Sequence, residues 1–225
     1  MQLLHIDSSI SGEQSVSRQL TASIVAHLKH TTSDLEITYR DIVAVPVPHL
    51  SPALQKRKLE ALSEGEALNT EAIQIQVAGA PGDHAATLQL EQDFATINAV
   101  LHEFLAADII VLGAPMYNFA IPSQLKAWID CFAAPGQTFR YTKQGIEGLC
   151  GDKRIIVASS RGGFYTAPSP IAEFDHQERY LASFFGFIGI SDITFVRAEG
   201  INLGDEQRQR SISAALAEVA SLRVA

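Results

Sequence analysis

A run of hydroxyl-bearing residues near the start of the chain has the composition of a phosphate site. The apolar run of Leu3, Leu4 and Ile6 stops at Asp7-Ser8-Ser9, and Ser15 and Ser17 stand where a helical repeat begins. Serine hydroxyls, the free N–H groups of a helix start and the positive end of the helix dipole together bind phosphate. The segment has neither a G-x-G-x-x-G pattern nor a P-loop lysine, so glycine-loop nucleotide binding is not supported. The alternative is a polar turn in which one serine caps the helix.

Two further loops carry residue types that suit a flat ring. Residues 116–119 read Met-Tyr-Asn-Phe and follow a continuous apolar segment. Large flat side chains at such a point can wall a planar ring. Residues 160–163 read Ser-Arg-Gly-Gly, and adjacent glycines let a backbone approach a ligand closely or adopt a positive φ. The alternatives are a loop tip with partly buried aromatics and an ordinary glycine turn.

Strands and helices in alternation position these loops. Short apolar segments indicate strands at residues 3–6, 108–114, 153–159 and 193–196, and apolar and polar residues that alternate over 35–40 indicate an edge strand. Apolar residues at helical spacing predict helices within residues 16–28, 94–107, 125–132, 180–188 and 212–222, and one broken helix or two short ones within 54–73, with an interruption at 79–82. This order favours a single α/β domain over residues 1–225 with a parallel sheet. Ligands of such sheets bind at the carboxyl ends of the strands, where all three loops lie.

Charge and composition exclude several classes of protein. Lys and Arg number 17 against 25 Asp and Glu, a net charge of −8 that is unlike a free-standing nucleic-acid binder. The chain has no basic leader, and no apolar run reaches the ~20 residues that span a bilayer, so we expect a cytoplasmic protein without a membrane partner. Cys131 and Cys150 are too few for a disulfide scaffold. His27 and His30 have no third ligand near them in sequence, so no metal site is expected.

The combination of these segments resembles the FMN-dependent NADH azoreductases, a branch of the flavodoxin-like quinone reductases. The matching segments are Ser8-Ser9-Ile10 with Ser15-Val16-Ser17, Ala114-Pro115-Met116-Tyr117-Asn118-Phe119 with Ser123-Gln124-Leu125-Lys126, Thr138-Phe139-Arg140-Tyr141-Thr142, Ser160-Arg161-Gly162-Gly163, Phe185-Gly186-Phe187-Ile188-Gly189-Ile190 and Ala198-Glu199-Gly200. The resemblance covers nearly the whole chain apart from residues 48–93. Within that gap, residues 68–93 are longer than is usual in the family, with residues 79–84 as an irregular tip.

The resemblance implies a fold and a cofactor. The fold is a flavodoxin-like three-layer sandwich, with a five-stranded parallel sheet in the order 2-1-3-4-5 and helices on both faces. The cofactor is non-covalent FMN, in a homodimer whose active sites lie at the subunit interface. The phosphate would be held by Ser9, Ser15, Val16 and Ser17, the isoalloxazine would be lined by Met116, Tyr117, Asn118 and Phe119, and its pyrimidine edge would be contacted by Ser160, Arg161, Gly162 and Gly163.

The implied activity is FMN-dependent NADH:quinone oxidoreduction and reductive cleavage of aromatic azo compounds. NADH is the expected donor, with NADPH as the alternative donor. Flavin N5 would carry the hydride in a ping-pong reaction, so no side chain is expected to be catalytic. His176 lies between the fourth strand and the next helix, a place from which it could border the flavin; the alternative is that it does not touch the substrate.

Two other functions fit the same pattern of elements. A flavodoxin-type electron-transfer protein would hold FMN but exchange single electrons with protein partners; the greater length of the chain speaks against it. A doubly wound module without a cofactor is the other alternative. A phospho-receiver of that class would have an aspartate at the end of the central strand, where this chain has Ala114-Pro115.

Overall fold

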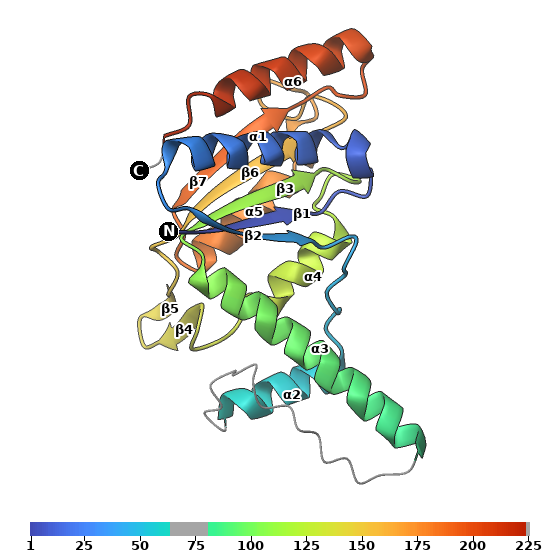
Figure 1. The fold of residues 1–225 in the computed structure, drawn as a ribbon, viewed down its shortest axis with the longest axis vertical. Helices are drawn as coiled ribbons and strands as arrows, with labels where there is room; N and C mark the ends of the chain where they lie inside the picture. The colour runs from blue at the N-terminus through green and yellow to red at the C-terminus, as the bar shows by residue number, and fades with distance from the viewer. Residues whose placement is uncertain (64–80, 224–225) are drawn as a thin grey trace.

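A parallel sheet of five strands forms the centre of the protein. The computed structural model describes residues 1–63 and 81–223. The strands of the sheet are β1 (Gln2–Asp7), β2 (Glu36–Asp41), β3 (Ile109–Pro115), β6 (Arg154–Ser160) and β7 (Asp192–Ala198). They lie in the order β2-β1-β3-β6-β7, and all neighbouring pairs are parallel (Figure 1). The predicted five-stranded parallel sheet is confirmed. The predicted order 2-1-3-4-5 is corrected to 2-1-3-6-7. The numbers differ because the chain forms two further strands, which were not predicted, after β3 and before β6.

These two strands form a separate hairpin. β4 (Phe139–Thr142) and β5 (Gly145–Gly148) pair antiparallel outside the main sheet. The hairpin packs closely on the end of the helix that precedes β7, since a Cβ placed at Gly148 would lie 2.2 Å from the backbone N of Gly189. Glycine is therefore required at this contact. Strands of four residues with mostly exposed side chains give too short an alternation to be predicted.

Helices cover both faces of the sheet (Figure 1). One apolar cluster joins the sheet to α1 (Val16–Thr31) and α6 (Asp205–Val219). A second cluster joins it to α3 (Pro81–Ala106), α4 (Ser123–Phe132) and α5 (Gln177–Phe187). Successive residues of the central strands β3 and β6 point to opposite clusters, which is why these two strands are buried almost throughout, whereas the edge strand β2 is mostly exposed. The predicted three-layer α/β arrangement is confirmed.

Helix α3 begins earlier than the sequence predicted. An interruption was expected at residues 79–82 and a helix from residue 94, but α3 already starts at Pro81. Proline is compatible with the first turn of a helix, because its missing N–H would have no partner there. Of the predicted irregular tip at residues 79–84, residues 81–84 belong to α3 and residues 79 and 80 lie outside the described residues. Of the helical structure expected within residues 54–73, the first part is helix α2 (Pro52–Ser63), and residues 64–73 lie outside the described residues.

Two buried lysines cap the carboxyl ends of helices. Lys58 on α2 donates hydrogen bonds to three carbonyl oxygens at the end of α4, those of Asp130, Cys131 and Ala133, at distances of 3.3, 3.1 and 3.1 Å. Lys153 donates to two carbonyl oxygens at the end of α3, both at 2.8 Å. Such lysines satisfy carbonyl groups that have no partner within the helix and complement the negative end of its dipole.

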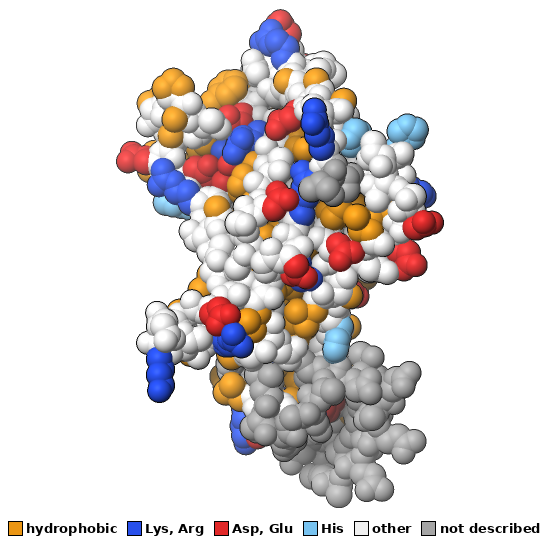
Figure 2. Space-filling view, turned by 90° about the vertical axis from the view of Figure 1, so that its left-hand side faces the viewer, with side chains coloured by type: hydrophobic (Ala, Val, Ile, Leu, Met, Phe, Trp, Pro, Cys, Tyr) orange, Lys and Arg blue, Asp and Glu red, His pale blue; other side chains and the backbone are white. Residues whose placement is uncertain are grey.

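The surface carries mixed charges. Figure 2 shows acidic and basic side chains interspersed over one face of the protein. Among the described residues, no helix has the length and apolar character needed to cross a bilayer.

Candidate functional site

Loops at the carboxyl ends of β1, β3 and β6 enclose a cleft of about 210 Å³, here called the inner cleft. The parallel register places these strand ends side by side, with Asp7 opposite Gly113 and Pro115 opposite Ser160. Seven of the twelve predicted cofactor residues line the inner cleft: Ser9, Ser15, Val16, Met116, Tyr117, Ser160 and Gly162. The other five are not part of its lining: Ser17, Asn118, Phe119, Arg161 and Gly163.

The start of α1 offers hydrogen-bond donors to the inner cleft. Ser15 is the N-cap of the helix, and its Oγ accepts a hydrogen bond from the backbone N of Arg18 at 3.2 Å. The Oγ of buried Ser17 lies 3.1 Å from that of Ser15. The backbone N–H groups of Val16 and Ser17 have no acceptor among the described residues. The first turn of α1 also has no acidic residue, so the positive end of its dipole is not neutralised there. This set of donors fits a phosphate group.

Arg18 fastens the first loop to the edge of the sheet. Its Nη2 donates to the carbonyl oxygen of Ser9 at 3.0 Å, and its Nη1 donates to Oδ2 of Asp41 at 2.7 Å. Burial tends to raise the pKa of the Asp41 carboxyl, but the hydrogen bond from Arg18 and the N–H groups of Ala44 and Val43 outweigh burial and lower the pKa below its ordinary value. The charge of Arg18 is therefore paired with the Asp41 carboxylate at the edge of the sheet.

Asp7, at the end of β1, lies beneath the same loop. It is buried, which tends to raise its pKa, yet its pKa is below the ordinary value because of His5, Thr21 and Arg18. The His5 Nε2 is 3.5 Å from Oδ1 of Asp7, and Thr21 Oγ1 donates to the same oxygen at 2.8 Å. A Cβ at Gly113 would lie 2.8 Å from this oxygen, so glycine on β3 leaves the space that the carboxylate occupies.

The loop after β3 is a tight turn. Tyr117 and Ala120 exchange backbone hydrogen bonds of 3.0 and 3.1 Å. The two residues between them, Asn118 and Phe119, have positive φ angles of 48° and 72°, as a two-residue turn of this handedness requires. A positive φ is uncommon for a bulky residue and concentrates at functional sites.

An aromatic cluster stands beside this turn. It consists of Phe119, Tyr165 and Phe174, with ring centroids 6.2 Å apart for Phe119 and Tyr165 and 5.4 Å apart for Phe119 and Phe174. Phe119 is 44% exposed and Phe174 is 41% exposed. The backbone N of His176 donates to the carbonyl oxygen of Phe119 at 3.0 Å, so His176 lies next to this cluster and is not in the lining of the inner cleft.

Gly162 permits a close approach, but not through a positive φ. Of the two alternatives for the glycine pair, the positive φ is wrong, since neither Gly162 nor Gly163 is among the glycines with positive φ. A Cβ at Gly162 would lie 2.7 Å from Nδ2 of Asn202. The backbone N–H groups of Gly162 and Gly163 have no acceptor among the described residues. This loop therefore presents backbone donors at the wall of the inner cleft.

The side chain of Arg161 is engaged elsewhere. It is fully buried and forms ion pairs with three carboxylates, those of Asp175, Glu178 and Glu199. Glu199 in turn accepts hydrogen bonds from the backbone N of Tyr165 at 2.7 Å and of Thr166 at 3.0 Å. Arg161 thus fixes the loop that follows β6, and its predicted contact with a ligand stays a prediction.

Several lining residues were not predicted. They are Ser11, Gln14, Pro115, Ile201, Asn202 and Arg208. Ile201 and Asn202 follow the carboxyl end of β7, so the rule that pointed to the other three loops could also have found them. Arg208 lies on α6, and no local pattern connects it to the serine loop.

The two cysteines and His27 lie outside the inner cleft and have structural surroundings. Burial raises the pKa of the Cys131 thiol to about 12 and that of Cys150 to about 11, so both stay protonated. His27 Nε2 lies 2.8 Å from the carbonyl oxygen of Leu222. Within residues 1–63 and 81–223, no group of three or more His, Cys, Asp or Glu side chains is arranged to hold a metal ion.

Known proteins match this chain over nearly its whole length. A family described as a flavodoxin-like fold matches residues 1–222. The chain is 50% identical over 222 residues to an FMN-dependent NADH:quinone oxidoreductase of Bradyrhizobium sp. (strain BTAi1), covering 99% of both chains. It is 51% identical over 216 residues to the protein of the same name from Rhizobium meliloti (strain 1021), covering 96% of this chain and 93% of that one. The crystal structure of an azoreductase from Bacillus anthracis str. Sterne superposes with a TM-score of 0.80 at 27% identity, covering 98% of this chain and 97% of the other.

Proposed function

The chain belongs to the flavodoxin-like family of the FMN-dependent NADH:quinone oxidoreductases, and we propose that it binds FMN in the inner cleft and uses NADH to reduce quinones. Reductive cleavage of aromatic azo compounds is the second activity we propose, and the likeness to an azoreductase structure supports it. The observation that carries the proposal is the start of α1, where the N–H groups of Val16 and Ser17 are free beside two serine hydroxyls.

The residues present fit FMN. One phosphate suits the donor set at Ser15, Val16 and Ser17. The ring would lie between the loop after β3 and the loop after β6, whose residues Met116, Tyr117, Ser160 and Gly162 line the inner cleft. No covalent link is required, because the phosphate and the ring each have their own set of contacts.

The protein's part in the reaction is to bind and orient. FMN supplies the hydride and electron chemistry when bound. The free N–H groups of Gly162 and Gly163 are donors suited to the pyrimidine edge of the ring, where negative charge develops on reduction. The buried thiols of Cys131 and Cys150 stay outside this chemistry, since neither lines the inner cleft.

Substrate and partner subunit would meet at the aromatic cluster. Phe119 and Phe174 are exposed rings next to the ligand site, and such a surface suits a planar quinone or azo compound. We propose that the protein is a homodimer in which a second copy covers this cluster, because exposed apolar patches mark interaction sites. Donor and acceptor would use one flavin face in turn, which is a ping-pong reaction. A cytoplasmic location stays a prediction.

The test is direct. The purified protein is heated, and the released yellow chromophore is identified by mass; FMN is expected. Turnover is then measured with NADH and with NADPH against a panel of quinones and one azo dye. The release of FAD, or the absence of flavin binding after reconstitution with FMN, would refute the proposal. A flavoprotein that oxidises NADH only in the presence of a redox protein partner would instead favour the electron-carrier alternative.

A further inference from the structure

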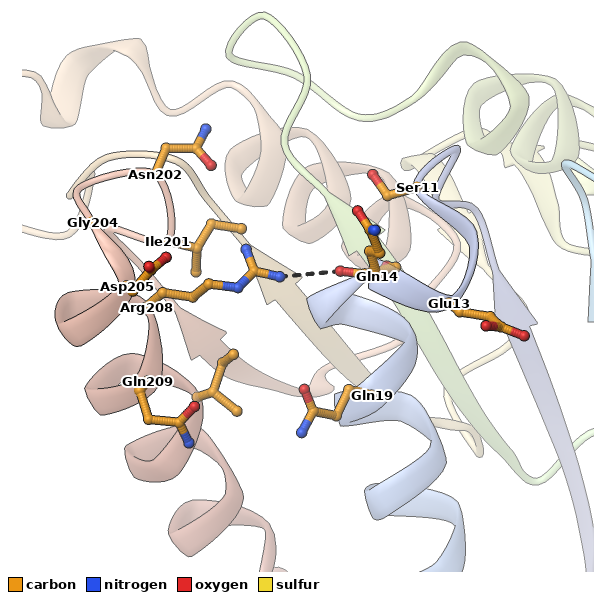
Figure 3. A pocket seen from close by; sticks show the side chains of 12 residues that line it. Ser11, Glu13, Gln14, Gln19, Ile201, Asn202, Gly204, Asp205, Arg208 and Gln209 are labelled. Atoms are coloured by element: carbon orange, nitrogen blue, oxygen red, sulfur yellow. Dashed lines mark hydrogen bonds between the residues drawn. The ribbon is translucent and has the colours of Figure 1, made fainter.

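A second, larger cleft opens beside the inner cleft. This outer cleft has a volume of about 790 Å³ and lies between the start of α1 and the start of α6 (Figure 3). The two clefts are continuous, because they share the lining residues Ser11, Gln14, Ser15, Ile201, Asn202 and Arg208. Ser15 is the N-cap of α1, so the junction of the clefts lies at the donor set assigned to the phosphate.

Arg208 is the one basic side chain in the described lining of either cleft. In Figure 3 it extends from α6 toward the 3₁₀ turn at Gly12–Gln14 that precedes α1. Its Nη2 donates to the carbonyl oxygen of Gln14 at 3.1 Å. This contact joins residues 194 positions apart in the chain.

Arg208 has no ion-pair partner among the described residues, although Glu13 and Asp205 also line the outer cleft. Within the described part of the chain, no carboxylate lies within ion-pair distance of its guanidinium, whereas Arg18 on the other side of the loop is paired with Asp41 at 2.7 Å. A guanidinium with one backbone acceptor keeps several N–H donors in a planar fork that matches phosphate. Arg208 therefore has both the charge and the donors to accept an anion.

The two helix starts at this junction differ in charge. Helix α6 carries Asp205 and Glu206 in its first turn, which neutralise the positive end of its own dipole. Helix α1 has no acidic residue there. An anion at the junction is thus attracted to the start of α1, and Arg208 reaches toward that point from the opposite side.

We propose that Arg208 pairs with the phosphate of FMN, opposite the start of α1. This inference rests on the proposed function and adds a binding residue to it. A phosphomonoester carries about −1.5 to −2 charges at pH 7. The pyrophosphate of NADH has the same chemistry, and the experiment separates the two sources.

The experiment compares FMN with riboflavin, which lacks the phosphate. Flavin is removed from wild type and from Arg208→Gln, and the dissociation constants of FMN and riboflavin are measured by fluorescence quenching. We expect the variant to bind FMN about tenfold more weakly or worse, and riboflavin within about twofold of wild type. Arg208→Lys should recover part of the FMN affinity, because it keeps the charge but loses the planar fork.

Salt and pH give a second readout. The FMN affinity of wild type should fall with rising salt, and also below about pH 6, where the phosphate takes up a proton. Both dependences should be weaker in Arg208→Gln. The matched control is Arg210→Gln on the same helix, whose guanidinium is exposed and bonded to Gln207 at 3.0 Å; it should bind FMN as wild type does.

The outcomes are distinct. Equal losses of affinity for FMN and for riboflavin would show that Arg208 only holds the loop in place. Unchanged FMN affinity with a raised KM for NADH would assign Arg208 to the binding of NADH. Either result overturns the inference while the proposed function stands. Wild-type protein that binds no FMN would overturn both.

Discussion

The hydroxyl oxygens of Ser9 and Tyr117 lie 3.2 Å apart, and this contact joins the loop after β1 to the loop after β3. The Tyr117 hydroxyl also accepts a hydrogen bond from the backbone N of Ile10 at 3.2 Å. Tyr117 therefore sets the distance between the loop assigned to the phosphate and the loop assigned to the ring.

Tyr117→Phe should loosen this connection without changing the fold. The Ser9 hydroxyl keeps its bond from the backbone N of Ser11, but the N–H of Ile10 loses its acceptor. We expect a loss of about 1 kcal/mol in the free energy of unfolding by urea, together with weaker FMN binding. Tyr141→Phe is the control, since that ring is 72% exposed on the hairpin. Equal stability of the two variants would show that the bridge contributes nothing.

Gly162→Ala should lower FMN affinity through a clash within the protein. The new Cβ would lie 2.7 Å from Nδ2 of Asn202 and would push that side chain or the loop into the cleft. The double variant Gly162→Ala with Asn202→Ala removes the clash and should recover stability. Gly163→Ala tests the steric argument, because its Cβ would meet no atom closer than 3.5 Å and its melting temperature should stay near that of wild type. If the double variant is no more stable than Gly162→Ala, the clash is not the cause.

Asp7 should make stability depend on pH in the acid range. Its pKa in the folded protein is below the ordinary value of 3.8, so the unfolded chain binds a proton at higher pH than the folded chain does. The stabilisation is fully present at neutral pH and is lost as the pH falls below 3.8 through the folded pKa. Urea unfolding of wild type and Asp7→Asn should therefore differ most at neutral pH and converge in acid. A constant difference over this range would contradict the prediction.

Lys58→Met should destabilise the protein although it adds an apolar side chain to a buried position. Three carbonyl oxygens at the end of α4 would lose their charged donor, and we expect a cost of about 2 kcal/mol. Lys56→Met, two residues earlier, is the control; its side chain is 79% exposed and its pair with Glu60 is a surface one. Thermal unfolding of both variants measures the difference, and equal melting temperatures would refute the capping role.

Turnover should follow ping-pong kinetics in a dimer. Initial rates against NADH at several fixed quinone concentrations should give parallel double-reciprocal lines, and light scattering should give twice the chain mass of 24.4 kDa. Phe119→Ser, at the exposed aromatic cluster, should weaken both the dimer and quinone turnover. Intersecting lines would mean that donor and acceptor bind together, and a fully active monomer would remove the interface from the mechanism.

The sequence predicts the sheet and its loops because burial on both faces leaves a continuous apolar pattern. Val111 and Leu112 are neighbours on β3, yet both are fully buried, one in each apolar cluster. The repeat of Val16, Leu20, Ile24 and Leu28 is likewise buried on α1. Three of the four loops that line the inner cleft follow from this pattern and from the rule that ligands bind at strand ends.

Side-chain directions in the site could not be predicted in the same way. Arg161 stands in a loop that suits a ligand, but carboxylates 14, 17 and 38 residues further along the chain, on Asp175, Glu178 and Glu199, take up its guanidinium. Arg208 reaches the serine loop from α6 across a much larger separation of 194 residues. Contacts between residues so far apart in the chain depend on the tertiary packing, and local sequence patterns do not predict them.

The order of the strands has a consequence for biosynthesis. The inner cleft takes its lining from residue 9 near the start of the chain to residue 208 on α6, and β1, which precedes the first loop of the cleft, pairs with β3, which is made only after α3. A chain growing on the ribosome therefore completes the cleft only when nearly all of it has emerged. Capture of the cofactor is therefore a late event in the life of the nascent protein, and a chain that stops before α6 is made would lack Arg208.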